Sequence, residues 1–387
     1  MKSINTLIFD LDGVITSEKK YWNTSRLTAW ELICDREFLG LTNYFGHSRD
    51  VATRLETIGD HIIPKTFIYE LKSRAINSNW DLTFFVCCLH FVGIFDALKK
   101  QQPTSLAPIL QDTNLTLQEQ LQSIGQLLQS NNYQSQISDT TIAEFWTATK
   151  SLTGSSVLNY VNTFIAQKLG QNFSFFDPKG ELWQVCYDNF QAWYEGKKGY
   201  DLPDDETVID LESIDHTLKA LADSGRFTLA IATGRPRNEV IEPLTKLGIL
   251  KYFDQTRVVT YDEVIAAESA IARDNQTKLG KPHPFILYKA IYPQESVFNL
   301  CSDGFKISNP QTIAYIGDAG SDVVAAKKAG VFSIGVLTGF AEGEAIRKKR
   351  EMLAGLGCDF ILDSVLDLPE WLIVHANNQP NNSPTVN

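Results

Sequence analysis

The pattern of apolar and polar positions divides the chain into three zones. Residues 7–9 form an apolar run that leads directly into Asp10-Leu11-Asp12-Gly13, which indicates one buried strand followed by a glycine turn within residues 1–16. From residue 17 to about 200 the apolar positions recur at helical spacing. From about 201 to 375 short apolar runs alternate with amphipathic stretches, which predicts strand–helix units. Because these runs lack strict alternation, we expect strands covered on both faces and hence a parallel sheet.

The elements expected in the second and third zones follow from these patterns. Strands are expected at 227–232, 257–260, 312–317 and 331–336, with an edge strand at 360–362. Helices are expected between them at 236–247, 282–291 and 321–329, two of which start at a proline. The second zone predicts helices at 21–38, 49–58, 64–76, 82–99, 155–169 and 180–194.

Three stretches depart from this pattern. Residues 101–141 are rich in Gln, Asn and Ser, which predicts a mobile or partly disordered surface elaboration with a weak helix at 115–128; a coiled contact between subunits is the alternative. Residues 376–387 are polar and contain proline, so we expect a disordered tail. Residues 82–98 are the most apolar window, but they are short for a membrane span and include His90 and Asp96, which favours a buried helix.

Composition narrows the class of protein. A chain of 387 residues has room for two or three domains, and its net charge of −11 argues against nucleic-acid and anionic-membrane partners. The six cysteines show no metal-ligand spacing, and the N-terminus has no signal-peptide pattern. We therefore expect reduced thiols in a cytoplasmic protein.

Asp10 and Asp12 are the first candidate site residues. Alternation along a strand puts both side chains on the same side, where two carboxylates repel each other unless a cation or a shared proton intervenes. Mg²⁺, held by carboxylates, water and a substrate phosphate, would satisfy the pair. The alternative is a polar strand end followed by a turn.

Two further segments offer groups that bind anions. Thr233-Gly234-Arg235-Pro236 ends one expected strand and starts a helix, where backbone N–H groups and the Thr233 hydroxyl favour an anion. The alternative is a plain helix cap. Lys281 precedes Pro282 and could neutralise a phosphate and crowded carboxylates, although a solvated surface lysine is its alternative.

A fourth segment again places acids after a buried strand. Asp318 follows the strand expected at 312–317 and is placed to bind a metal directly, and Asp322 follows at the helix start. Asp322 could bind the metal directly or through water, or it could cap the helix. All four segments lie at carboxyl ends of strands, where ligands bind in open α/β sheets.

In this order, DLDGV, TGR, KP and GDAGSD resemble the motifs of the haloacid dehalogenase superfamily, and in particular its phosphoglycolate phosphatase and β-phosphoglucomutase group. The resemblance covers residues 1–16 and about 201–372. It implies a Rossmann-like parallel sheet of order 3-2-1-4-5 with helices on both faces, built from residues 1–16 and 201–375. Residues 17–200 would be an enlarged all-α cap, with hinges near 16–17 and 196–204.

The resemblance also implies roles for the matching residues. Asp10 would be the nucleophile, and Asp12 the general acid and then the general base. Mg²⁺ would be held by the Asp10 carboxylate, the Asp12 backbone carbonyl and Asp318, with Asp322 direct or supporting. Thr233, the Gly234 N–H and Lys281 would hold the phosphoryl oxygens.

The choice of reaction depends on finer features. Asp12 together with Asp318 favours phosphate chemistry over dehalogenation, and GDAGSD is more similar to phosphoglycolate phosphatases than to the mutase. We therefore expect a phosphatase for a small phosphorylated metabolite. A β-phosphoglucomutase-like mutase and a non-catalytic binding protein are the alternatives. His47, Ser48 and Arg49 resemble a substrate-contacting cap segment, and a homodimer through residues 82–98 is left open.

Overall fold

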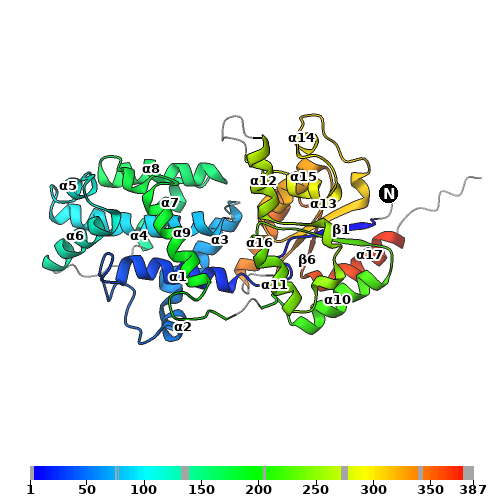
Figure 1. Cartoon of the computed structure of the whole chain (residues 1–387), viewed down its shortest axis with the longest axis horizontal. Coiled ribbons are helices and arrows are strands. Elements are labelled where there is room, and N and C mark those ends of the chain that lie inside the picture. Colours follow the sequence, from blue (N-terminus) through cyan, green and yellow to red (C-terminus); the bar gives the residue numbers. More distant parts are fainter. Residues whose placement is uncertain are drawn as a thin grey trace, which may run out of the picture. The chain divides into compact units, whose positions relative to one another are not determined.

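The computed structural model describes residues 4–74, 76, 78–131, 139–203, 206–271, 278–338 and 343–377. The chain forms two compact units (Figure 1): residues 1–18 with 204–387, and residues 19–203. These boundaries lie within a few residues of the expected ones. The first unit holds the sheet, and the second is helical.

Six parallel strands form one sheet in the order β3-β2-β1-β4-β5-β6. The strands are β1 (Thr6–Phe9), β2 (Thr228–Ala232), β3 (Val258–Val259), β4 (Ile313–Gly317), β5 (Phe332–Val336) and β6 (Phe360–Leu362). In the central strand, Phe9 pairs with Ile231 on one side and Ile316 on the other. The predicted order 3-2-1-4-5 is confirmed, and β6 adds the edge strand expected at 360–362.

Helices cover both faces of this sheet, as the apolar strand runs predict (Figure 1). Leu7 and Phe9 pack in one apolar cluster, and Ile8 packs in another on the opposite face. The helices of this unit are α10 (Leu211–Asp223), α11 (Asn238–Lys246), α12 (Tyr261–Ile271), α13 (Phe285–Ile291), α14 (Val297–Leu300), α15 (Gly320–Ala329), α16 (Glu344–Gly355) and α17 (Leu368–Asn377).

Two helix starts differ from the prediction. The helix expected from residue 236 begins at Asn238, because the Arg235 carbonyl accepts a hydrogen bond from Tyr261 N instead of entering the helix. The helix expected from residue 282 begins at Phe285, because Pro284 disfavours helical backbone at the residue before it. Thr233 and Gly234 therefore lie on the loop after β2, and Lys281 lies on the loop between α12 and α13. The prediction that all four segments lie at carboxyl ends of strands is wrong for Lys281, which follows a helix.

Two connections join the units. Ser17 N donates to the Glu206 carbonyl at 2.8 Å, and Val208 N donates to the Ile15 carbonyl at 2.9 Å. The outgoing segment therefore pairs at the expected first hinge with residues just after the expected second one. Residue 204, the last of the expected second hinge, lies outside the described residues, and hinge motion stays a prediction.

Helix α4 lies among α1, α7, α8 and α9 in the helical unit (Figure 1). It is long and apolar enough to cross a membrane, but 78% of its most apolar window is buried inside the unit, as in a core helix. The expected buried helix at 82–98 is thus present. The helices of this unit are α1 (Lys19–Cys34), α2 (Val51–Ile62), α3 (Lys65–Ser73), α4 (Asn79–Gln101), α5 (Leu106–Leu110), α6 (Leu117–Ser130), α7 (Asp139–Ala148), α8 (Ser155–Leu169) and α9 (Glu181–Tyr194).

The polar stretch is not a surface elaboration over residues 106–130. Helix α6 starts at a capping box between Thr116 and Glu119 and buries four apolar residues in the core of the unit: Leu117, Leu121, Ile124 and Leu128. Their helical spacing outweighs the glutamines on the other face, so that prediction is wrong. Residues 132–138 lie outside the described residues. Helix α17 includes 376–377 of the expected tail, and the remaining tail, 378–387, is also outside them.

Candidate active site

Asp10 sits at the centre of the sheet's carboxyl edge. It follows β1 directly, and its backbone N–H donates to the Ile316 carbonyl at 2.8 Å. The residue is 4% exposed, one carboxylate oxygen lies 2.9 Å from Lys281 Nζ, and Oδ1 is buried without a hydrogen-bond partner among the described residues. Burial raises the pKa of Asp10 to about 7, although the Lys281 charge opposes the rise.

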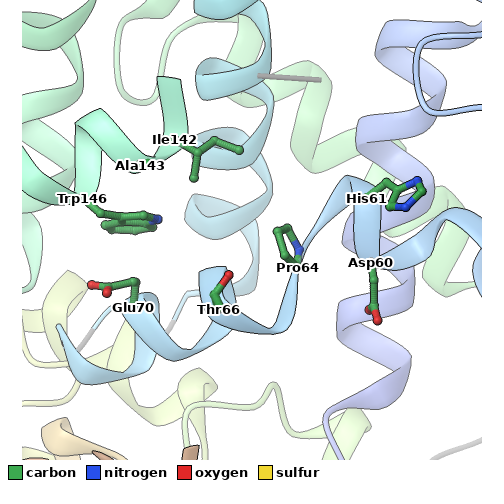
Figure 2. Close-up of a pocket in the computed structure, with 8 residues that line it drawn as sticks. All are labelled: Asp60, His61, Pro64, Thr66, Glu70, Ile142, Ala143 and Trp146. Atoms are coloured by element: carbon green, nitrogen blue, oxygen red, sulfur yellow. The ribbon is translucent and has the colours of Figure 1, made fainter. Parts of the chain in front are cut away.

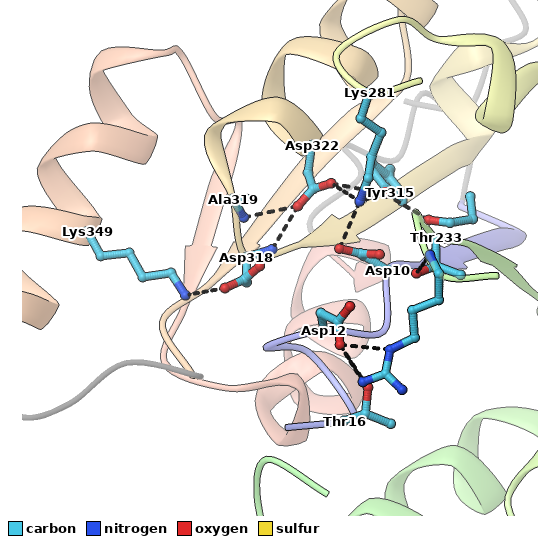
Figure 3. A network of polar contacts seen from close by, with 12 residues as sticks. Asp10, Asp12, Thr16, Thr233, Lys281, Tyr315, Asp318, Ala319, Asp322 and Lys349 are labelled. Carbon is cyan, nitrogen blue, oxygen red and sulfur yellow. Dashed lines mark hydrogen bonds and ion pairs between the residues drawn. The ribbon is translucent and has the colours of Figure 1, made fainter. Parts of the chain in front are cut away.

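Lys281 bridges two carboxylates from different motifs. Its ammonium lies 2.9 Å from Asp10 Oδ2 and 2.8 Å from Asp322 Oδ1, and the Tyr315 hydroxyl is 3.4 Å away (Figure 3). Burial would lower the pKa of Lys281, but the charges of Asp10 and Asp322 outweigh burial and hold it well above its usual value. The surface-lysine alternative is therefore wrong, because this side chain is 7% exposed.

Asp322 anchors this arrangement from the first turn of α15. Its Oδ2 accepts hydrogen bonds from the N–H groups of Asp318 and Ala319, at 3.2 and 3.0 Å, so it caps the helix. Its Oδ1 accepts from Lys281 and, at 3.1 Å, lies within hydrogen-bond reach of the Tyr315 hydroxyl. Both oxygens thus have partners, which favours an orienting role over direct metal coordination.

Three acids meet in a geometry that fits a cation. One oxygen each of Asp10, Asp318 and Asp322 lies within 4.8 Å of the others, and all three residues are buried. Burying a carboxylate oxygen without a hydrogen-bond partner costs free energy. Hard divalent cations bind oxygen ligands, which crowded carboxylates supply. The donor set, together with the unpartnered Oδ1 of Asp10, therefore fits Mg²⁺.

Asp12 belongs to a separate ion pair. Its Oδ1 accepts hydrogen bonds from Arg235 Nε at 2.9 Å and Nη2 at 2.5 Å, and Thr16 Oγ1 lies 3.5 Å away. The Arg235 side chain is 2% exposed and the Asp12 side chain 20% exposed. Arg235 thus balances the charge of Asp12, and this ion pair is separate from the cluster of Asp10, Asp318 and Asp322.

Thr233 and Gly234 follow β2, beside Asp10. Thr233 is fully buried, and its N–H donates to the Val259 carbonyl at 3.0 Å. Its hydroxyl oxygen accepts from Arg235 N at 3.4 Å. Gly234 is exposed, and no atom lies within 4 Å of the position that a Cβ would occupy. The loop therefore leaves open space for a ligand next to Thr233.

Three residues of this site were not singled out as site residues from the sequence. Arg235 lies inside the TGR motif and Tyr315 inside β4, but neither type marks a site by itself. Lys349 pairs with Asp318 Oδ2 at 3.0 Å (Figure 3) and is 2% exposed. A signal for Lys349 exists, because it shares a helical stripe with Ile346 and Leu353.

The expected specificity residues lie in the helical unit. His47 and Arg49 are exposed, and Ser48 Oγ accepts a hydrogen bond from Arg54 Nε at 3.1 Å. Asp50, which follows them, caps α2. Substrate selection by these residues stays a prediction.

A cavity of about 500 Å³ also lies in the helical unit, between α2–α3 and α7 (Figure 2). Its walls include Glu70, Ile142 and Trp146, and none of the expected site residues. Glu70 is already paired with Arg74 at 2.9 Å. The three acids that could hold a metal, Asp10, Asp318 and Asp322, do not line this cavity.

The chain matches known proteins in sequence and in fold. The family model described as haloacid dehalogenase-like hydrolase matches residues 125–336, which include Thr233, Lys281, Asp318 and Asp322. A crystal structure of a structural genomics target superposes with a TM-score of 0.69 at 24% identity, over 96% of this chain and 98% of the other. That likeness shows the fold.

Curated relatives share part of the sequence. A phosphoglycolate phosphatase of Vibrio vulnificus is 29% identical over 164 residues, which are 42% of this chain and 57% of that protein. The phosphoglycolate phosphatase of Escherichia coli is 32% identical over 164 residues, 42% of this chain and 51% of that protein. The match thus spans little more than half the length of these relatives. With more than half of its length matched by the family model, the chain belongs to the haloacid dehalogenase-like hydrolases, and part of its sequence is similar to phosphoglycolate phosphatases.

Proposed function

We propose that this protein is a Mg²⁺-dependent phosphate-monoester hydrolase that works through an aspartyl-phosphate on Asp10. The observation that carries the proposal is the environment of Asp10, which is buried and paired on one oxygen with Lys281, while its other oxygen has no hydrogen-bond partner among the residues that the structure describes. Membership of a hydrolase family and relatives named phosphoglycolate phosphatase support the same chemistry.

In the first step a carboxylate oxygen of Asp10 attacks phosphorus, and the bond between phosphorus and the ester oxygen breaks. The leaving oxygen takes a proton from Asp12, and the dephosphorylated product departs as an alcohol while the phosphoryl group stays on Asp10. In the second step Asp12 takes a proton from water, whose oxygen attacks the same phosphorus. The bond between phosphorus and the Asp10 oxygen breaks, inorganic phosphate leaves and the Asp10 carboxylate is restored.

The residues around Asp10 supply charge and donors for the transferred group. The Lys281 ammonium, the Thr233 hydroxyl and the Gly234 N–H would hold the phosphoryl oxygens, and Asp322 keeps Lys281 in place through their 2.8 Å contact. Phosphoryl transfer depends mainly on such positioning and neutralisation.

Asp10, Asp318 and the backbone carbonyl of Asp12 would hold the metal, with Asp322 in support. Bound there, Mg²⁺ would neutralise charge on the phosphoryl oxygens and between the carboxylates. Supporting observations are the three acids within 4.8 Å and the unpartnered oxygen of Asp10.

We further propose a small phosphorylated metabolite as substrate, with His47, Ser48 and Arg49 as selecting groups. The relatives' names support an anionic phosphate ester of low mass. A cytoplasmic setting is proposed as well, supported by the six cysteines, all of which are free thiols.

The test is a panel of phosphorylated metabolites and one aryl phosphate, read by phosphate release with Mg²⁺ and with chelator. The proposal expects metal-dependent release from at least one compound and none from Asp10→Asn. Conversion of a hexose 1-phosphate to its 6-phosphate, dependent on a bisphosphate primer, would instead identify a mutase. No release and no conversion across the panel would favour a binding protein.

A further inference from the structure

Lys349 places a second buried ammonium at the acidic cluster. It lies on α16, 3.0 Å from Asp318 Oδ2, and both side chains are 3% exposed. Lys281 sits elsewhere, between Asp10 and Asp322. Lys281 therefore balances the charges of Asp10 and Asp322, and Lys349 balances the charge of Asp318.

The position of the Lys349 ammonium is fixed by neighbouring backbone. Its Nζ donates to the Thr338 carbonyl at 2.6 Å, and the Thr338 hydroxyl donates to the Gly13 carbonyl at 2.6 Å. The side chains of Lys349 and Thr338 thus link helix α16, the segment after β5 and the loop after Asp12. A lysine so anchored cannot swing into solvent without breaking these contacts.

The contacted oxygen of Asp318 is also enclosed on another side. Gly13 has a φ of +73°, and a Cβ at this position would come within 2.4 Å of Asp318 Oδ2. Glycine therefore lets the loop close over the carboxylate. Because water has little room there, the attraction between Lys349 and Asp318 is weakly screened.

We propose that Lys349 is a positioning residue that acts as a built-in counter-cation for Asp318 and weakens Mg²⁺ binding by charge. This inference rests on the proposed function. Without a divalent ion the ammonium balances Asp318, and a bound ion is repelled by it at close range. The site would hold its shape when empty and release the metal more readily.

The experiment measures Mg²⁺ binding to the full chain by isothermal titration calorimetry, for the wild type and for Lys349→Met, Lys349→Gln and Lys349→Arg. Lys348→Met is the matched control, because Lys348 is the preceding residue on α16 and its side chain is 48% exposed. Each protein is first checked for cooperative thermal unfolding in chelator. A variant that does not unfold cooperatively is left out, and the other neutral variant takes its place.

We expect the neutral variants to bind Mg²⁺ on the order of tenfold more tightly than the wild type, since a repulsive charge near the metal is removed. Lys349→Arg and Lys348→Met should match the wild type. Affinity that is unchanged or weaker in the neutral variants, or tighter binding by Lys349→Arg, overturns the inference. If both neutral variants fail to fold, the inference also falls, because Lys349 is then needed for the fold itself. If the wild type binds no Mg²⁺, the proposed function fails with it.

Discussion

Arg235 donates two hydrogen bonds, from Nε and Nη2, to the same carboxylate oxygen of Asp12. Its Nη2 also lies 3.3 Å from the Ser17 carbonyl, and its Nη1 lies 3.3 Å from the Glu239 carbonyl. The guanidinium is thus fixed by backbone while it holds the side chain that we propose as acid and base. Arg235 therefore sets where the Asp12 carboxylate lies.

Replacing Arg235 by methionine should lower kcat roughly tenfold to a hundredfold, because the proton donor loses its fixed position. KM should change little, since Lys281 and Thr233 are untouched. Steady-state kinetics on the best compound of the panel measures both constants. Arg226→Met, at an exposed position of the same unit, is the control, and a kcat equal to that control would contradict the assigned role.

Removal of the Tyr315 hydroxyl should raise KM and lower the stability of the fold. The hydroxyl is buried, lies 3.0 Å from the Ala232 carbonyl and contacts both Lys281 and Asp322. Tyr315→Phe should raise KM a few-fold and lower the free energy of unfolding by about 1 kcal/mol for each buried hydrogen bond that the hydroxyl makes. Denaturant unfolding and kinetics measure the two effects, with Tyr288→Phe as control. An unchanged KM would show that the hydroxyl does not help to position Lys281.

Asp10 should make the metal-free protein less stable as pH rises. Its pKa is about 7 in the fold and 3.8 ordinarily, so between these values the folded chain keeps a proton that the unfolded chain loses. The stability that the protonated form supplies is full below about pH 4 and is lost as pH rises through about 7. Asp10→Asn has no such loss.

The check is thermal unfolding in chelator from about pH 5 to about pH 8. The Tm of Asp10→Asn minus that of the wild type should increase toward the alkaline end. Titrating groups that do not interact with Asp10 are common to both proteins and cancel in the difference. Parallel Tm curves would mean that burial does not perturb Asp10.

The sheet order and the places of the motif residues were predictable, because both follow from local rules. Apolar runs mark buried strands, and polar residues at their ends in a parallel sheet share one edge. Asp10, Lys281 and Asp322 come from three distant segments, and the structure brings them within contact. Strand ends indicate the places of Asp10 and of the segment with Asp322, whereas Lys281 follows α12 and is indicated only by its Lys-Pro motif.

The residues that sequence reasoning missed depend on which face of a helix or loop is buried. Lys349 lies in the run Arg347-Lys348-Lys349-Arg350, which is typical of a solvated helix face, and only Lys349 of the four is buried. Helix α6 was underrated for the opposite reason, since its glutamines concealed a regular apolar stripe. Local composition is a poor guide to burial in a helix, because the positions that face the core recur only every three or four residues.

The most direct test of the central claim is to trap the covalent intermediate. The full chain is mixed with a ³²P-labelled substrate and Mg²⁺, quenched in acid and digested, and the labelled peptide is identified. We predict acid-stable, base-labile label on the peptide that contains Asp10, and no label with chelator or in Asp10→Asn. Turnover without label at Asp10, or label on another residue, would contradict the account.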